Sequence, residues 1–309
     1  MAQSDELLTA LLAEREAVLI RLGAAERRSV PIRTNIEADY EATPYAGMDD
    51  RGYPLWQSHK VRGEWIFVLD AELTDYGYAV DEQLDDEDFR AQELPKATSE
   101  YEGKVRYSLE FIDRFAGRLT FRGFLNGASF ELGLDILLRL SILGYRHEGP
   151  LGYAGETLAE GYAFELEQRW KQAFFCYFSA LESLLDVHRG VVNRWLEADK
   201  QIPENERLRD KLSKVTASQL LRGNYRLNEV GFWTWLRTRF ITLEELRNAI
   251  AHNEPHTPVD RRATAETFVI FAVVAALLDN ADPDVTGVLR YFAVPHRGAR
   301  KQRWEDGDD

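Results

Sequence analysis

A Gly- and Pro-rich stretch between Gly144 and Gly155 divides the sequence into two parts of different character. Almost everything after it carries apolar residues at helical spacing, whereas the part before it alternates between several patterns. Helices are expected at about 157–188, 206–221, 229–253 and 257–279, the last of them opening with Thr257 as N-cap and Pro258 in its first turn. Long helices joined by short connections predict an up-and-down bundle over residues 151–296.

The first part, residues 1–150, predicts a separate region of uncertain fold. Its apolar spacing indicates an amphipathic helix over about 5–28 and another helix over 129–143. A strand or a short helix fits 64–80 equally well. The segment after Ser99 has a capping box and helical spacing, yet Val105 to Phe111 alternate as a strand does. The fold class expected is therefore mainly α, with a small β element before the bundle. Residues 297–309 form a charged tail that is expected to be disordered.

The composition limits the classes of function. A net charge of −14 disfavours a protein that coats nucleic acid along its whole surface. The single cysteine, Cys176, excludes an internal disulfide framework and a cysteine-based zinc site. No apolar run reaches membrane-spanning length, and the first residues do not resemble a secretory signal, so a cytoplasmic protein without membrane contact is expected.

A local group of bases stands out against this acidic background. It lies between Arg207 and Arg226, where one carboxylate, Asp210, opposes it, and Arg237 and Arg239 follow, interleaved with Trp233 and Trp235. Such a group can hold an RNA strand at one place on an acidic protein. The residues expected to bind RNA are Lys211, Lys214, Arg222 and Arg226. Each of them could also be an ordinary solvated side chain on a helix.

The sequence Arg247-Asn248-Ala249-Ile250-Ala251-His252 places an always-charged group and a neutral-pH titrating group near the end of one helix, ahead of Pro255. Asn248 and His252 are four residues apart and share a helix face, so the Asn248 side chain is expected to orient the imidazole. Arg247 lies about 140° around the axis from His252, but its length lets it reach across. An arginine and a histidine at this position also suit the helix dipole without any catalytic role.

A carboxylate interrupts an apolar stripe in the first long helix. Phe175, Phe178, Glu182 and Leu185 recur at three- and four-residue steps. Burying Glu182 unpaired would cost roughly several kcal/mol, so a partner is expected, either Arg247 or His252. The pairing could equally be a structural ion pair.

The R-N-x-x-x-H spacing, together with the segment from Phe178 to Leu185, resembles HEPN domains, many of which are ribonucleases that act as dimers. The resemblance implies a metal-independent endoribonuclease without a cofactor, in a toxin, antiviral-defence or stress role. It implies His252 as the proton-transfer group, Arg247 as the phosphate-binding group, and Asn248 and Glu182 as their supports. The partners implied are RNA, a second copy of the chain and an antitoxin or regulatory protein. The alternative is a non-catalytic HEPN-like scaffold or sensor that binds nucleic acid or protein.

Overall fold

The computed structural model describes residues 2–36, 52–60, 65–79, 105–113, 118–126, 133–252, 257–279 and 282–293. The chain forms two compact units. The helical unit consists of Met1–Glu26 together with Tyr145–Asp309, and the β unit consists of Arg27–Gly144. Along the sequence, the β unit is therefore an insertion into the helical unit.

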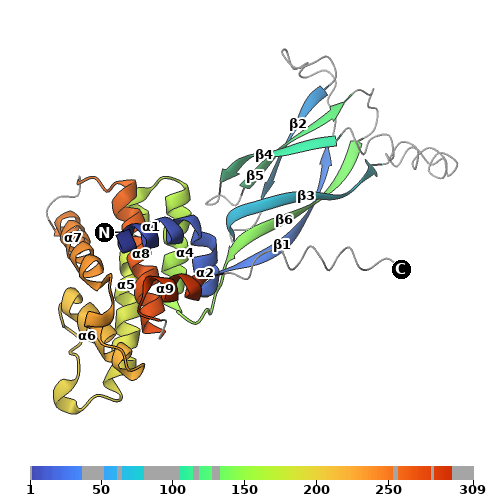
Figure 1. Cartoon of the computed structure of the whole chain (residues 1–309). Helices are drawn as coiled ribbons and strands as arrows, with labels where there is room; N and C mark the ends of the chain where they lie inside the picture. Colours follow the sequence, from blue (N-terminus) through green and yellow to red (C-terminus); the bar gives the residue numbers. More distant parts are fainter. Residues whose placement is uncertain are drawn as a thin grey trace, which may run out of the picture. The chain divides into compact units, whose positions relative to one another are not determined.

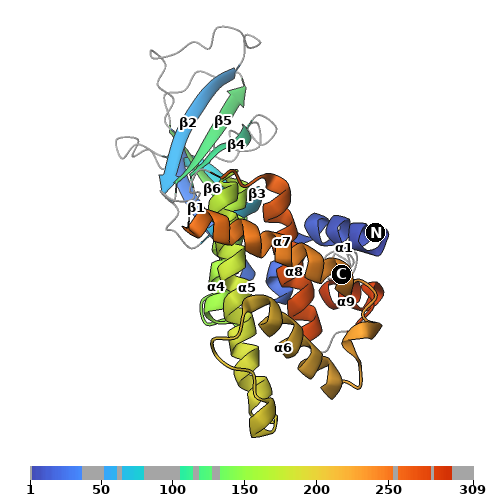
Figure 2. The ribbon, with the colours of Figure 1, turned by 90° about the vertical axis from the view of Figure 1, so that its left-hand side faces the viewer.

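The helical unit is built around one central helix, α8. Its helices are α1 (Ala2–Ala13), α2 (Arg15–Arg21), α4 (Tyr153–Leu166), α5 (Trp170–Asn193), α6 (Leu208–Arg222), α7 (Trp233–His252), α8 (Arg261–Leu278) and α9 (Val285–Phe292). Every residue of α8 from Thr264 to Leu278 is buried. That is possible because α1, α5, α6, α7 and α9 all pack against it (Figures 1 and 2). A helix that is buried around its whole circumference needs such neighbours on every side.

Two helix boundaries differ from those expected. The helix predicted over 157–188 is two helices, α4 and α5, separated at Glu167–Arg169, where Gln168 has a φ of 59°. The cap of α8 is Asp260, whose Oδ1 accepts a hydrogen bond from the Ala263 amide at 2.8 Å, so the prediction of Thr257 as the cap is wrong. An aspartate directly before the first turn satisfies the free N–H groups there. Helix α9 was not predicted.

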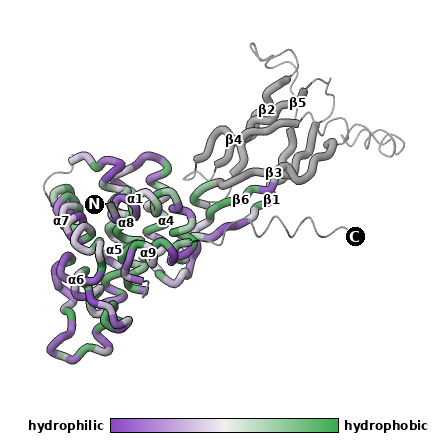
Figure 3. Tube along the Cα trace, viewed as in Figure 1, coloured by the Kyte–Doolittle hydropathy of each residue, from purple (hydrophilic) through white to green (hydrophobic). Residues whose placement is uncertain are grey.

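Helices α6 and α7 carry both polar and apolar side chains along their length, as Figure 3 shows. Leu212, Val215 and Leu220 of α6 are buried, whereas Arg222 is exposed. The two helices contact each other, and α6 also contacts α5. Helix α6 therefore packs against both α5 and α7.

The N-terminal segment belongs to the helical unit, which corrects the prediction that residues 1–150 form one region. The single helix predicted over about 5–28 is two helices, α1 and α2. The second ends at Arg21, shortly before Gly23, whose φ is 69°, and strand β1 (Ala25–Ile36). Leu7, Leu11, Val18 and Leu19 are almost fully buried. These apolar contacts explain why the first two helices fold with the residues that follow Gly144.

Among its described residues, the β unit contains two sheets of three strands, in which the pairs β3–β6, β2–β5 and β4–β5 are antiparallel. One has the order β1–β6–β3, with β3 at Trp65–Ala79 and β6 at Gly133–Tyr145. The other has the order β2–β5–β4, with β2 at Gly52–Lys60, β5 at Arg118–Asn126 and β4 at Val105–Asp113.

Two helices predicted in this region are strands instead. Within the helix predicted over 129–143, the described residues from Gly133 onward belong to strand β6, which pairs with β3; residues 129–132 lie outside the described part of the chain. Val105–Asp113 form β4, as the alternation from Val105 indicates; residues 99–104, which include the expected capping box, lie outside the described residues. The expectation of a mainly helical chain with a β element before the bundle is confirmed, and the tail 297–309 lies outside the described residues.

Candidate active site

Helix α7 carries the Arg247–His252 motif and is fixed by its buried face. Phe240 lies against Phe178 of α5, with the two rings stacked and their centroids 5.7 Å apart. Leu236, Leu243 and Ile250 are buried along the same helix. This packing determines which side chains of the last two turns point toward α5.

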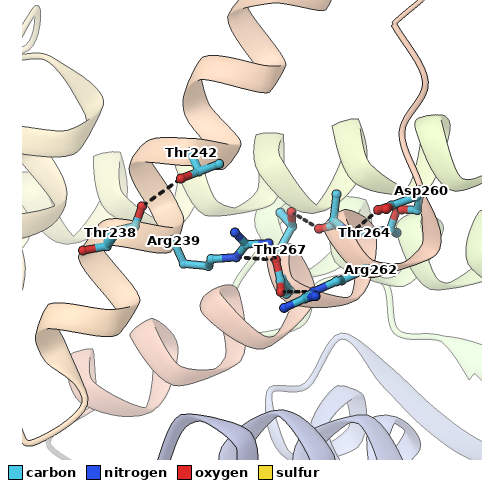
Figure 4. Close-up of polar contacts among 9 residues, drawn as sticks. Thr238, Arg239, Thr242, Asp260, Arg262, Thr264 and Thr267 are labelled. Carbon is cyan, nitrogen blue, oxygen red and sulfur yellow. Dashed lines mark hydrogen bonds and ion pairs between the residues drawn. The ribbon is translucent and has the colours of Figure 1, made fainter. Parts of the chain in front are cut away.

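A buried carboxylate also holds α7 to α8. Glu266 of α8 is only 3% exposed and accepts a hydrogen bond from Arg239 Nε at 2.6 Å and one from Arg262 Nε at 2.9 Å. Figure 4 shows the Arg239 and Arg262 side chains coming from the two helices to the same carboxylate, that of Glu266. Because an unpaired buried carboxylate would be costly, this pairing restrains how α7 can slide or rotate on α8.

The predicted pair between Glu182 and Arg247 is present. Arg247 Nη2 donates to Glu182 Oε1 at 3.1 Å, and each side chain is 32% exposed. The Arg247 guanidinium carbon also lies 5.9 Å from the ring centroid of Phe178. The arginine therefore reaches across from α7 to α5 and stays accessible to solvent.

Asn248 has a different partner from the one expected. Its Oδ1 accepts a hydrogen bond from Arg247 Nη1 at 3.1 Å, so its amide oxygen supports the guanidinium rather than the imidazole. Arg247 thus donates to Asn248 with one terminal nitrogen and to Glu182 with the other. His252 is the last residue of α7 and is exposed, and within the described part of the chain its imidazole makes no hydrogen bond or ion pair. The structure thus brings together Glu182, Arg247 and Asn248, while His252 stands one turn further along.

Charged neighbours surround the Glu182–Arg247 pair. Burial raises the pKa of Glu182, and Asp186 and Glu244 raise it further, while the Arg247 guanidinium and Lys211 lower it. Lys211 Nζ lies 2.6 Å from Asp186 Oδ1, and Arg209 Nε lies 3.4 Å from Glu244 Oε2.

These two ion pairs connect α6 to α5 and α7 beside the site. Sequence spacing gave no sign of them, because each joins residues on different helices. The Glu182 carboxyl is therefore held in a network of alternating charge, in which it keeps its proton more readily than an exposed glutamate does.

The four residues expected to bind RNA do not behave alike. Lys211 is buried and its ammonium group pairs with Asp186, so little of this side chain is open to solvent. A half-buried apolar face explains this, because a lysine can lay its stem along such a face and pair its head at the edge. Lys214 is exposed and paired with Glu206. Arg222 lies 5.5 Å over the Trp195 ring, and Arg226 is exposed.

No helix among the described residues has the length and apolar character needed to cross a bilayer. Within the same residues, no three His, Cys, Asp or Glu side chains gather as a metal site would require. The chain matches no protein-family model, and no curated protein or solved structure shows significant similarity to it.

Proposed function

We propose that this protein is a metal-independent endoribonuclease of the HEPN type. The observation that carries the proposal is the Arg247 guanidinium, which is held by Glu182 of another helix and remains one-third exposed, with His252 on the same helix. A guanidinium has five N–H donors. Glu182 and Asn248 each accept one of them, so others are available for a phosphate.

The chemistry proposed is attack by the RNA strand on itself. His252 removes the proton from a ribose 2′-hydroxyl, whose oxygen forms a bond to the adjacent phosphorus. The bond from phosphorus to the 5′-oxygen breaks, and that oxygen takes up a proton from a second acid. The products carry a 2′,3′-cyclic phosphate and a 5′-hydroxyl. Arg247 stabilises the charge that develops on the phosphoryl oxygens, and Glu182 and Asn248 orient Arg247.

The need for a second acid predicts a homodimer. One imidazole cannot hold the base role and the acid role in the same step, whereas two motifs in one cleft supply both. The exposed position of His252 at the end of α7 is compatible with contact to a second copy. Sedimentation analysis of the full chain tests this part of the proposal, and a monomer under conditions in which RNA is cut would contradict it.

Cleavage is tested with purified full-length protein, a mixed RNA substrate and a metal chelator. Wild type should cut, and Arg247→Ala and His252→Ala should each reduce the rate by roughly a hundredfold or more. The matched controls are His147→Ala and Arg261→Ala, because His147 and Arg261 are exposed and lie outside the motif. If the controls lose activity as strongly as the motif variants, or if wild type does not cut RNA, the proposal fails.

A biological role in defence or stress is part of the same proposal. It predicts that expression of the intact chain arrests growth and that His252→Ala relieves the arrest. It also predicts a protein partner that restrains the nuclease at rest. Arrest that persists in the His252→Ala variant would contradict the link between cleavage and toxicity.

The second candidate is a non-catalytic RNA-binding module. It is favoured by the absence of a contact between the His252 imidazole and the Arg247–Glu182 pair in the described residues. In that case wild type and His252→Ala would bind an RNA strand equally and neither would cut it. The cleavage assay and a parallel binding assay therefore separate the two functions.

A further inference from the structure

A cavity of about 460 Å³ lies at the start of α7, away from the Arg247–His252 motif. Asp210 and Lys214 of α6 line one part of it, and Trp233, Arg237 and Thr238 of α7 line another. Its volume falls in the range of sites that take small organic ligands, roughly 300–1,000 Å³.

The lining combines positive charge with hydroxyl groups. Arg237 is exposed and makes no ion pair within the described part of the chain, whereas its neighbours Arg239 and Arg209 are both paired to carboxylates. Lys214 is also exposed, and its ion pair with Glu206 leaves donors free. Thr234 and Thr238 add hydroxyl groups to the same lining. Such a set suits a phosphate group.

The remaining lining suits more than a bare anion. Asp210 is a carboxylate and would repel a free phosphate ion, but it can accept hydrogen bonds from hydroxyl or amino groups of a larger ligand. Part of the mostly buried Trp233 side chain provides an apolar wall against which a flat ring can pack. We propose that this cavity binds a phosphorylated ribonucleotide unit, with its phosphate between Lys214 and Arg237 and its nucleoside part toward Trp233 and Asp210.

This site is separate from the motif. Ten residues from Arg237 to Arg247 correspond to about 15 Å along a helix. The Arg209–Glu244 ion pair joins α6 and α7 within that interval. Binding at the cavity can therefore be altered without touching Arg247, Asn248 or Glu182, and the inference does not depend on RNA cleavage.

The unit could be a free nucleotide or part of an RNA strand. Calorimetric titration of the full-length protein with AMP, ATP, inorganic phosphate and a short oligoribonucleotide distinguishes these sources. The strand is titrated into His252→Ala protein, so that cleavage cannot consume it. Arg237→Gln and Lys214→Gln remove one charge each, and Arg261→Gln is the control with the same charge change outside the cavity.

Binding of a nucleotide or of the strand should weaken about tenfold or more in Arg237→Gln and in Lys214→Gln, and should stay unchanged in Arg261→Gln. Cavity-dependent binding of AMP or ATP identifies a free nucleotide, and cavity-dependent binding of the strand alone identifies a unit within RNA. The proposal is overturned if neither binds, if the cavity variants bind as the control does, or if inorganic phosphate binds as tightly as AMP.

Discussion

The buried hydrogen bond of Tyr177 gives the sharpest test of what holds the helical unit together. Tyr177 of α5 is fully buried, and its hydroxyl donates to Glu165 Oε2 of α4 at 2.7 Å. Arg15 of α2 pairs with the other oxygen of that carboxylate. The contact thus joins the N-terminal segment, α4 and α5 at one carboxylate.

The substitution Tyr177→Phe removes one oxygen atom and leaves the ring in place. The ring keeps its contact with Phe268, whose centroid is 5.3 Å away, so no cavity of side-chain size forms. A hydrogen bond to a charged group contributes about 1.5–3 kcal/mol, and its loss leaves a buried acceptor without its donor. The free energy of unfolding should therefore fall by about 1.5–3 kcal/mol.

The control is Tyr291→Phe, the same chemical change at an exposed hydrogen bond. Tyr291 donates to Asp279 Oδ2 at 2.8 Å, where water can replace the lost partner, so a change within about 0.5 kcal/mol is expected. Urea unfolding followed by the helical circular dichroism signal measures both variants. Equal losses in the two variants would refute the argument that burial makes the Tyr177 contact strong.

The difference in stability between wild type and Tyr177→Phe should also depend on pH. Burial raises the pKa of Tyr177 well above its ordinary value of 10.0, and the Glu165 carboxylate raises it further. The folded state therefore keeps the phenol protonated after the unfolded state has begun to ionise. The stability that the hydroxyl contributes is complete below pH 10 and declines above it, so the difference between wild type and Tyr177→Phe should shrink there.

Three further substitutions or reactions test other parts of the structure. Burial raises the pKa of Glu182 above 4.5, so ionisation of this carboxyl disfavours the folded state. The free energy of unfolding of wild type should therefore fall relative to that of Glu182→Gln as the pH rises from about 4 to 7. A difference in unfolding free energy between the two proteins that stays constant with pH would contradict this. A Cβ at Gly161 would lie 2.6 Å from the Tyr177 ring, so Gly161→Ala should lower the free energy of unfolding by about 1–3 kcal/mol, partly offset by a gain of about 1 kcal/mol in helix propensity. The control is Gly190→Ala, whose added Cβ meets nothing within 4 Å and should only stabilise the helix. Urea unfolding midpoints measure both variants, and equal shifts would contradict the close packing of α4 and α5. Burial raises the pKa of Cys176 to about 12. Near neutral pH the folded protein should therefore react with iodoacetamide far more slowly than the urea-unfolded protein does. Equal reaction rates would contradict this.

Most of the helical unit could be predicted from the sequence because the apolar pattern of a helix lies in residues that are close together in the chain. Apolar residues every three or four positions mark α6, α7 and α8 within a few residues of their observed bounds. The Glu182–Arg247 pair was also predictable, since a carboxylate in an apolar stripe requires a partner. Two local rules, periodicity and charge satisfaction, were enough for these features.

The β unit was harder because several of its strands pair with distant segments, as β2 does with β5 and β3 does with β6. Strand β6 pairs with β3, and its leucine-rich sequence also satisfies a helical pattern. The ion pairs of Lys211 and Arg209 were missed for the same reason, since each joins residues of two different helices. Local sequence alone does not record such distant contacts.

The insertion of Arg27–Gly144 has a consequence for the way the chain is made. The first helices leave the ribosome early, but the helices against which Leu7, Leu11, Val18 and Leu19 are buried are not synthesised until the whole inserted unit has passed. During that interval the apolar faces of α1 and α2 have no native partner and offer a binding site for chaperones. A shortened protein should therefore keep Met1–Glu26 and replace only the insertion with a brief linker to Tyr145. The two ends to be joined lie side by side, because the Ala24 carbonyl accepts a hydrogen bond from the Arg146 amide at 3.2 Å.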